Sequence, residues 1–173
     1  MKYISPDGDN KFPGNVEAIV KFELTDDNAI VINYDATADA PTIINMTNHT
    51  YFNLSGDFNN TIEESILQVN ADNYTPADET YMPTGEIRPV EGTVFDFRTP
   101  KAIGADFASG DAEIAAAGGG YDHNWCLNTK GNQDEVCATM VDPRSGIKLE
   151  MYTNEPGVQC YTANFQDGTR PGK

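Results

Sequence analysis

The 173-residue sequence is poor in basic residues, in histidine and in cysteine. Eleven Lys and Arg stand against 27 Asp and Glu, which gives a formal net charge of -16. Such a chain repels phosphate backbones and anionic lipid head groups. The composition therefore excludes nucleic acid and membrane surfaces as expected partners. Because the acidic residues are scattered along the chain, we interpret them as a solubilising surface and not as a cation-binding face.

The few cysteines and histidines do not form the spaced motifs that are typical of disulfide or metal sites. Cys126, Cys137 and Cys160 are odd in number, have no C-x-x-C spacing and stand among apolar or strand-forming neighbours. Buried, reduced thiols are the expected state, which favours a reducing compartment. Two histidines far apart in sequence, and no EF-hand spacing after Asp7, leave no set of metal ligands. We therefore expect neither a metal ion nor a cofactor.

Long hydrophobic runs are absent as well. No run approaches the roughly 20 apolar residues that cross a bilayer, and the N-terminal stretch MKYISPDGDN has no apolar segment like that of a signal peptide. The sequence predicts a soluble protein and, with reduced thiols, favours the cytoplasm. A periplasmic or secreted location stays open as an alternative, since the sequence does not establish that Met1 is the natural start.

Alternation of apolar and polar residues with a period of two dominates the chain and predicts β-strands. The clearest case is residues 16–24, and after turn residues 25–28 the alternation returns over residues 30–36, which predicts a hairpin. Residues 142–146 predict the turn of a second hairpin. Further strands are expected at residues 42–52, 62–69, 94–97, 124–127, 135–141, 147–153 and 158–164.

Helical periodicity is scarce. Residues 110–117, stopped by three glycines, predict one short helix, and residues 100–107 predict a turn of another. Residues 76–89 are rich in Pro, Gly and acidic residues and predict a long ordered loop, where β scaffolds often meet ligands. We expect one all-β domain with the architecture of a sandwich.

The stretch INMTNHTYFNLSG, residues 44–56, surrounds one of the two histidines. Taken as a strand, it places five polar or aromatic residues on one face: Asn45, Thr47, His49, Tyr51 and Asn53. Such a face suits a ligand with many hydroxyls. A solvated strand with an incidental histidine is the alternative. Three N-x-S/T sequons also lie here, but three glycans would hardly fit on one short strand.

Two later stretches place polar groups where a loop enters a strand. GGGYDHNWC, residues 118–126, combines three glycines, which let a ligand approach the backbone, with the polar group Asp-His-Asn. Asp-His pairs also serve as simple turn caps. In EPGVQCYTAN, residues 155–164, Gln159 shares a strand face with Tyr161 and Ala163. Its amide either meets a ligand hydroxyl or is an ordinary surface group.

Together and in this order, these stretches resemble the aldose 1-epimerase (galactose mutarotase) family. TNHTYFNLSG (47–56) resembles the segment around the family's catalytic histidine, GGGYDHNWCL (118–127) its aspartate segment, and PGVQCYTANFQDG (156–168) its glutamine-bearing strand. SPDGDNKFPGNV (5–16) resembles the stretch that precedes the family's first matching hairpin. The resemblance implies the family's large antiparallel β-sandwich, the mutarotase-like supersandwich.

The activity that the resemblance implies is the interconversion of the α and β anomers of hexoses such as galactose and glucose. Ring opening needs a base that removes the anomeric hydroxyl proton and an acid that protonates the ring oxygen. By similarity His49 is that acid, since imidazole exchanges protons near neutral pH. Asp122 matches the family's hydroxyl-binding aspartate and Gln159 a substrate-lining glutamine. The implied partner is a small aldose.

The chain departs from the family pattern at both ends. The family's general base is a glutamate downstream of the glutamine strand, and an upstream block carries an Asn-Arg pair and another substrate-binding histidine; neither lies within residues 1–173. We expect residues 1–173 to be the central part of one family domain whose N-terminal and C-terminal parts are absent. The chain alone is then expected to be inactive until those segments join it, unless Glu155 or Asp167 replaces the base. A carbohydrate-binding β-sandwich without catalysis is the alternative.

Overall fold

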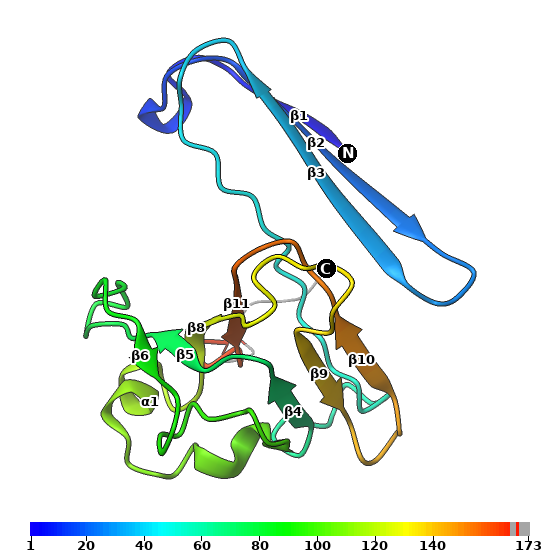
Figure 1. Ribbon diagram of the computed structural model, residues 1–173, viewed down its shortest axis with the longest axis vertical. Coiled ribbons are helices and arrows are strands. Elements are labelled where there is room, and N and C mark those ends of the chain that lie inside the picture. Colours follow the sequence, from blue (N-terminus) through cyan, green and yellow to red (C-terminus); the bar gives the residue numbers. More distant parts are fainter. Residues whose placement is uncertain (167–168, 170–173) are drawn as a thin grey trace. The chain divides into compact units, whose positions relative to one another are not determined.

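The computed structural model describes residues 1–166 and 169, and the chain forms two compact units, Met1–Thr50 and Tyr51–Lys173 (Figure 1). The described elements are almost all antiparallel strands. Within the described residues no helix has the length and apolar character needed to span a membrane.

The first unit is a three-stranded antiparallel sheet in the order β1-β2-β3, formed by β1 (Lys2–Ser5), β2 (Val16–Leu24) and β3 (Ile30–Ala38). A short 3-10 turn, Asp9–Lys11, lies between β1 and β2. β2 and β3 pair continuously, with Val16 opposite Ala38 and Leu24 opposite Ile30. This confirms the first predicted hairpin; β1 has no counterpart among the predicted strands.

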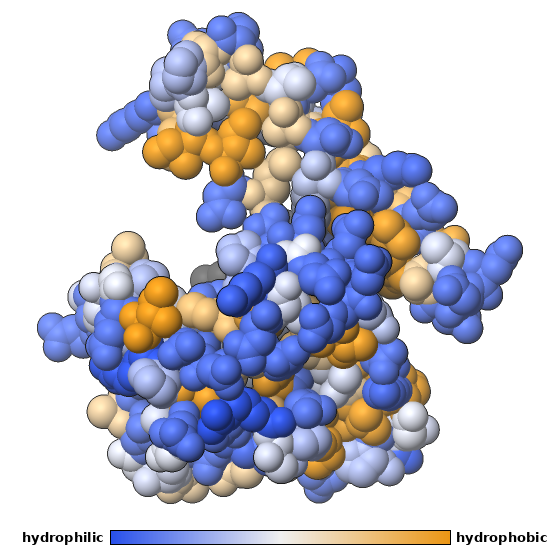
Figure 2. Space-filling model, in the orientation of Figure 1, coloured by the Kyte–Doolittle hydropathy of each residue, from blue (hydrophilic) through white to orange (hydrophobic). Residues whose placement is uncertain are grey.

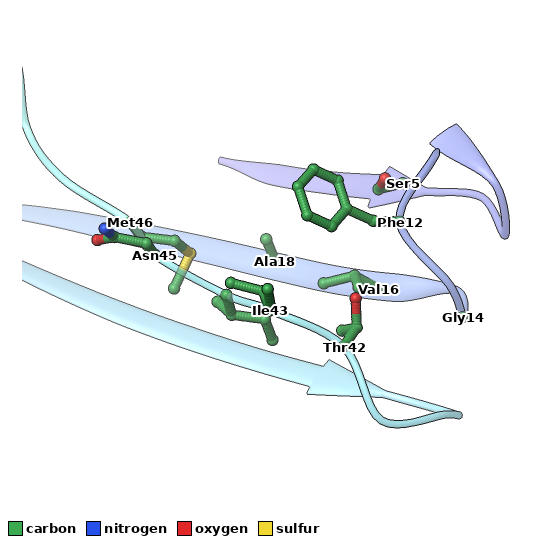
Figure 3. A pocket seen from close by; sticks show the side chains of 10 residues that line it. Ser5, Phe12, Gly14, Val16, Ala18, Thr42, Ile43, Asn45 and Met46 are labelled. Carbon is green, nitrogen blue, oxygen red and sulfur yellow. The ribbon is translucent and has the colours of Figure 1, made fainter. Parts of the chain in front are cut away.

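The apolar face of this hairpin is only partly covered. Val16, Ala18 and Val20 are partly buried, whereas Leu24 is 78% and Ile30 63% exposed at the far end. Hydrophobic side chains are visible on the surface of this unit in Figure 2. At the covered end, residues 42–46 line a pocket of about 190 Å³ together with Phe12 and β2 (Figure 3). The predicted half-buried strand is therefore partly buried at one end only.

The second unit contains two four-stranded antiparallel sheets. The first has the order β10-β9-β4-β7, with β4 (Ile66–Val69), β7 (Lys101–Ala102), β9 (Ala138–Val141) and β10 (Lys148–Met151). The second has the order β11-β8-β5-β6, with β5 (Asn73–Thr75), β6 (Arg88–Pro89), β8 (Asp122–Cys126) and β11 (Gly157–Tyr161). A 3-10 turn, Ile103–Asp106, and the five-residue helix α1, Ala112–Ala116, complete the unit.

Both sheets contribute to one hydrophobic core. Trp125 of β8 is fully buried, and its Nε1 donates a 2.9 Å hydrogen bond to the Phe95 carbonyl. Phe95 stacks on Tyr74 of β5 with ring centroids 4.2 Å apart. The buried cluster comprises Leu67, Val69, Ala71, Tyr74, Val90, Phe95, Phe97, Ile103, Ile114, Tyr121, Trp125, Leu127 and Cys137. Burial of this apolar area stabilises the sheet β11-β8-β5-β6 against the rest of the unit.

Most predicted elements of the second unit are confirmed with different bounds. β4, β8, β9, β10 and β11 fall within or across the expected segments, and the turn at residues 142–146 joins β9 to β10. The predicted helix is α1, which begins after Asp111 because that carboxylate accepts the backbone amides of Glu113 and Ile114. The predicted turn at residues 100–107 contains the 3-10 segment, and residues 76–89 are mostly loop.

Two predicted strands are wrong. Residues 94–97 are irregular, because Thr93 Oγ1 accepts the Phe95 amide and turns the chain, so the alternating phenylalanines are buried without a ladder. Residues 42–52 also form no regular element. There, Asn48 Oδ1 accepts the Thr50 amide at 3.1 Å, a local bond that competes with strand pairing.

Candidate functional site

One face of the sheet β11-β8-β5-β6 is polar. Along β8, partly buried Asp122, Asn124 and Cys126 alternate with buried His123 and Trp125. Directly paired residues of antiparallel strands project to the same side. The pairs Asp122 with Tyr161, Asn124 with Gln159, and Asn124 with Thr75 therefore define the polar face: Thr75, Asp122, Asn124, Gln159 and Tyr161.

Two of the predicted site residues meet on this face. Gln159 Nε2 donates a 2.9 Å hydrogen bond to Asp122 Oδ1. The Asp122 side chain is partly buried and that of Gln159 is exposed. A carboxylate and a primary amide side by side present several acceptors and two donors, which is the chemistry that recognises sugar hydroxyls.

Glycine shapes the same face at two positions. A Cβ at Gly157 would contact Asn124 Oδ1 closer than van der Waals separation and lie 3.2 Å from the Trp125 carbonyl. Asn124 in turn donates from Nδ2 to Thr75 Oγ1 at 3.3 Å. A Cβ at Gly120 would contact the side-chain oxygens of Asn164 and Thr162 in the same way. Only glycine allows these polar side chains to lie so close to the backbone.

The turn after β11 is fixed to the loop before β8. Asn164 Nδ2 donates to the carbonyls of Ala117 at 2.7 Å and Tyr121 at 2.9 Å. The Tyr121 amide donates to Thr162 Oγ1 at 2.9 Å. These bonds join the loop before β8 to the turn after β11, next to the Asp122–Tyr161 pair. They therefore fix the backbone positions from which the Asp122 and Tyr161 side chains project.

Aromatic rings border the polar face. Tyr161 contacts Tyr51 edge to face with centroids 6.0 Å apart, and it lies 6.5 Å from Phe165. Phe165 contacts Tyr81 at 5.5 Å. Tyr51, Tyr81 and Phe165 are each about half exposed. Apolar ring surface beside directed polar groups is typical of small-molecule sites.

The cysteine behind this face is in a position that disfavours its thiolate. Cys160 stands opposite His123 in the β8–β11 ladder, on the side away from Asp122 and Gln159. Burial, together with the Asp122 charge, raises the pKa of the Cys160 thiol to about 12. The thiol therefore stays protonated near neutral pH, where only the thiolate is reactive.

His49 is exposed and lies in the irregular segment at the end of the first unit. The expected five-residue strand face around it is not formed, because residues 42–52 are not a strand. The structure thus brings Asp122 and Gln159 together, and it places His49 in a different unit from that pair.

Of the two substitute bases, Glu155 is exposed in the turn before β11, and Asp167 lies outside the described residues. Within the described part of the chain, no group of three or more His, Cys, Asp and Glu side chains is arranged to hold a metal ion. No role was predicted for Asn124, Tyr161 or His123, although all three fall in the quoted motifs. Their strand pairing, which the motifs do not encode, is what places them around Asp122.

Sequence similarity to known proteins identifies the family of the chain. The family described as Aldose 1-epimerase matches residues 1–172. The galactose mutarotase of Homo sapiens is 44% identical over 171 residues, which cover 98% of this chain and 47% of that protein. The aldose 1-epimerase of Escherichia coli (strain K12) is 43% identical over 165 residues, covering 95% of this chain and 47% of that protein.

The fold agrees with the sequence relatives. The crystal structure of galactose 1-epimerase from Lactobacillus acidophilus NCFM matches with a TM-score of 0.85 and 34% identity, covering 98% of this chain and 48% of that chain. The expected all-β, mutarotase-like architecture is therefore confirmed. The chain spans about half the length of the curated relatives it matches. The resemblance noted in the sequence is confirmed: the chain belongs to the aldose 1-epimerase family.

Proposed function

We propose that residues 1–173 are the central part of an aldose 1-epimerase, an isomerase that interconverts the α and β anomers of hexoses such as galactose and glucose. The observation that carries the proposal is the hydrogen bond between Gln159 and Asp122 on an open polar face, in a chain of this family. Relatives named galactose mutarotase and aldose 1-epimerase support the same substrate class.

The reaction requires two balanced proton transfers. A base takes the proton of the anomeric hydroxyl, the bond between the anomeric carbon and the ring oxygen breaks, and an acid protonates the ring oxygen. Rotation about the adjacent carbon–carbon bond and the reverse steps give the other anomer. We assign His49 the role of the acid, because an imidazole both donates and accepts protons near neutral pH.

In this proposal Asp122 and Gln159 bind substrate hydroxyls. The Asp122 carboxylate accepts hydroxyl protons, and the hydrogen bond from Gln159 keeps that carboxylate directed along the polar face. The neighbouring ring of Tyr161 offers apolar surface to the sugar. Binding by several directed groups holds the sugar while its anomeric carbon reacts.

The general base comes, in this proposal, from the part of the family domain that the chain does not span. The matched relatives are about twice as long. The exposed apolar end of β2 and β3, with Leu24 and Ile30, supports contact with that part, because such surface gains free energy when covered. Residues 1–173 alone are then inactive, and the segments that complete the fold are the chain's macromolecular partner.

We also place the protein in the cytoplasm. The support is the state of the thiols: all three cysteines lie in the described part of the chain, and all three are free. Free thiols that are partly or fully buried are usual in a reducing compartment.

Polarimetry on freshly dissolved α-galactose tests the function directly, because mutarotation needs neither a cofactor nor a coupling enzyme. The complete protein containing this chain is compared with its His49→Gln variant and with a protein-free blank. The proposal expects acceleration by the first and loss of at least a hundredfold in the second, the usual contribution of a general acid. Unchanged activity in His49→Gln overturns the role of His49. Galactose binding in calorimetry without any acceleration by the complete protein would favour the alternative of a non-catalytic carbohydrate-binding sandwich.

A further inference from the structure

A charged cluster lies on the reverse side of the polar face. Glu113 of α1 directs its side chain towards the sheet, where Oε1 accepts hydrogen bonds from the Tyr74 hydroxyl at 2.9 Å and from Arg88 Nη1 at 2.7 Å. Arg88 Nη1 also donates to the Tyr74 hydroxyl at 3.1 Å. One carboxylate oxygen is therefore fixed by groups from β5 and β6.

The other oxygen of Glu113 has no such bonds. Oε2 is buried and has no hydrogen-bond partner among the described residues. It lies 3.7 Å from Nε2 of His123, whose side chain is only 2% exposed. A buried carboxylate oxygen without a partner is costly, so a native structure retains one where it serves a purpose. Here the oxygen faces an imidazole nitrogen at a distance suited to an electrostatic contact.

The second nitrogen of His123 accepts a hydrogen bond from the backbone of Asp122. His123 Nδ1 accepts the amide N–H of Asp122 at 3.1 Å. A nitrogen that accepts carries no proton, so the neutral ring bears its proton on Nε2, on the side of Glu113. The ladder between β5 and β8 ends at the pair Thr75–Asn124, before it reaches Asp122. The imidazole is thus the hydrogen-bond acceptor for the Asp122 amide, which lies beyond the last residue pair of the β5–β8 ladder.

We propose that His123, oriented by Glu113, is a positioning residue that fixes the backbone of Asp122 and thereby holds its carboxylate against Gln159 and the substrate. The chain of contacts runs from Arg88 and Tyr74 through Glu113 and His123 to the Asp122 amide. His123 itself faces away from the polar side and does not touch substrate. This role rests on the proposed function, which makes Asp122 a substrate-binding residue.

The same geometry makes the role dependent on pH. Three carboxylates act electrostatically on the ring: Glu113 of α1, Asp111 at the N-cap of α1, and Asp122 of its own strand. Phe95 and Tyr74 pack against it, and Cys160 stands opposite it on β11. Burial outweighs the carboxylates and lowers the pKa of His123 below 6.5. Near neutral pH the ring is neutral and Nδ1 accepts; in more acidic solution both nitrogens bear protons, and the Asp122 amide loses its acceptor.

Two substitutions in the complete protein separate positioning from simple packing. His123→Phe keeps an aromatic ring but removes the acceptor, whereas His123→Asn keeps an acceptor oxygen near the place of Nδ1. We expect His123→Phe to raise the KM for galactose about tenfold, the effect of one lost hydrogen bond in a site, with a smaller change in kcat. We expect His123→Asn to stay within about threefold of the wild type. An equal loss in both variants, or a KM unchanged in a folded His123→Phe variant, overturns the proposal.

Amide hydrogen exchange gives a readout that does not depend on activity. Exchange at the Asp122 amide is expected to accelerate about tenfold or more in His123→Phe and to stay near wild type in His123→Asn. The Leu127 amide, which donates to the Pro156 carbonyl at 2.9 Å, is the internal control and should not change. Unchanged exchange at Asp122 in His123→Phe contradicts the role of His123 even where the protein is active. If the wild type lacks anomerisation but the exchange pattern holds, the proposed function fails and the positioning contact stands.

Should His123→Phe fail to fold, Glu113→Gln tests the same contact. An amide at this position keeps an oxygen for Tyr74 and Arg88 but opposes the His123 ring with a neutral group. We expect a several-fold rise in KM, and we expect the wild-type rise in KM below pH 6.5 to shift to lower pH, because the lost carboxylate no longer favours the charged ring. A KM profile that does not differ from wild type would rule out orientation by Glu113.

Discussion

Gln159 and Asp122 are 37 positions apart in sequence and are joined by a 2.9 Å hydrogen bond across the β8–β11 ladder. They are not direct partners in that ladder, since Gln159 stands opposite Asn124 and Asp122 opposite Tyr161. The bond therefore runs diagonally over the polar face. It ties the two strands together on the side where substrate is proposed to bind.

Removing the amide should weaken sugar binding. In Gln159→Ala, Asp122 loses a hydrogen bond donor and the substrate loses an amide, so we expect the KM for galactose to rise about tenfold. Because Gln159 is exposed, the free energy of unfolding should change by less than about 1 kcal/mol. Polarimetric kinetics and urea denaturation of the complete protein measure the two effects. Gln133→Ala, an exposed glutamine in the loop before β9, is the matched control and should leave KM unchanged.

The close approach of Gly157 to Asn124 predicts a specific pair of effects. Gly157→Ala places a methyl group against Asn124 Oδ1, so we expect it to destabilise the fold by about 1–3 kcal/mol, the usual effect of overpacking. Asn124→Ala removes the obstructing amide, and the double variant should recover part of that loss. Urea denaturation of the four proteins forms a double-mutant cycle. If the losses in free energy of unfolding are strictly additive, the contact with Asn124 is not the reason why position 157 requires glycine.

The hairpin turn between β9 and β10 carries an acid-sensitive contact. Asp142 is fully buried and accepts hydrogen bonds from the Ser65 hydroxyl and from Arg144. The bonds from Arg144 outweigh burial and hold the pKa of Asp142 well below its ordinary 3.8. A depressed pKa means that the unfolded chain binds the proton more readily, so this contribution to stability is full above about pH 4 and falls as the pH is lowered further.

Asp142→Asn should remove this acid dependence. We expect its free energy of unfolding to be lower than that of wild type at pH 7, because the buried pairing with Arg144 is lost, and the difference to shrink as the pH falls below 4. Asp134→Asn, in an exposed turn, is the control and should follow the wild-type curve. Denaturant titrations between pH 3 and 7 provide the measurement. A difference from wild type that is constant over this range would contradict the assignment.

Local sequence patterns were enough to predict the hairpin of β2 and β3, the turn at residues 142–146 and α1. Each of these depends on contacts within a few residues: alternation, turn residues and the Asp111 cap. The same alternation misled at residues 94–97, because Phe95 and Phe97 are buried on one side of a turn that Thr93 forms. Alternating burial alone therefore does not establish a β-strand, because a strand also needs a neighbouring strand to which its backbone can hydrogen-bond.

The candidate site was predictable only as a set of motifs. The resemblance drew attention to His49, Asp122 and Gln159, but the contact between the last two depends on the register of β8 and β11, which alternation does not encode. The role proposed for His123 had no sequence signal beyond its place next to Asp122. It requires Glu113, which reaches the ring only because α1 packs behind the sheet.

The exposed end of the first sheet predicts self-association of residues 1–173. Ile30 and Leu24 stand opposite each other on the apolar face and are largely exposed, and β1 and β3 are edge strands of the sheet. Exposed apolar surface next to open edges favours pairing with another chain. In analytical ultracentrifugation, Ile30→Ser should therefore lower the average mass of this chain at a given concentration. Val31→Ser is the matched control, because Val31 is also an exposed β-branched residue but projects to the opposite face. Equal effects of the two substitutions would show that general surface hydrophobicity, and not the apolar face of the hairpin, drives association.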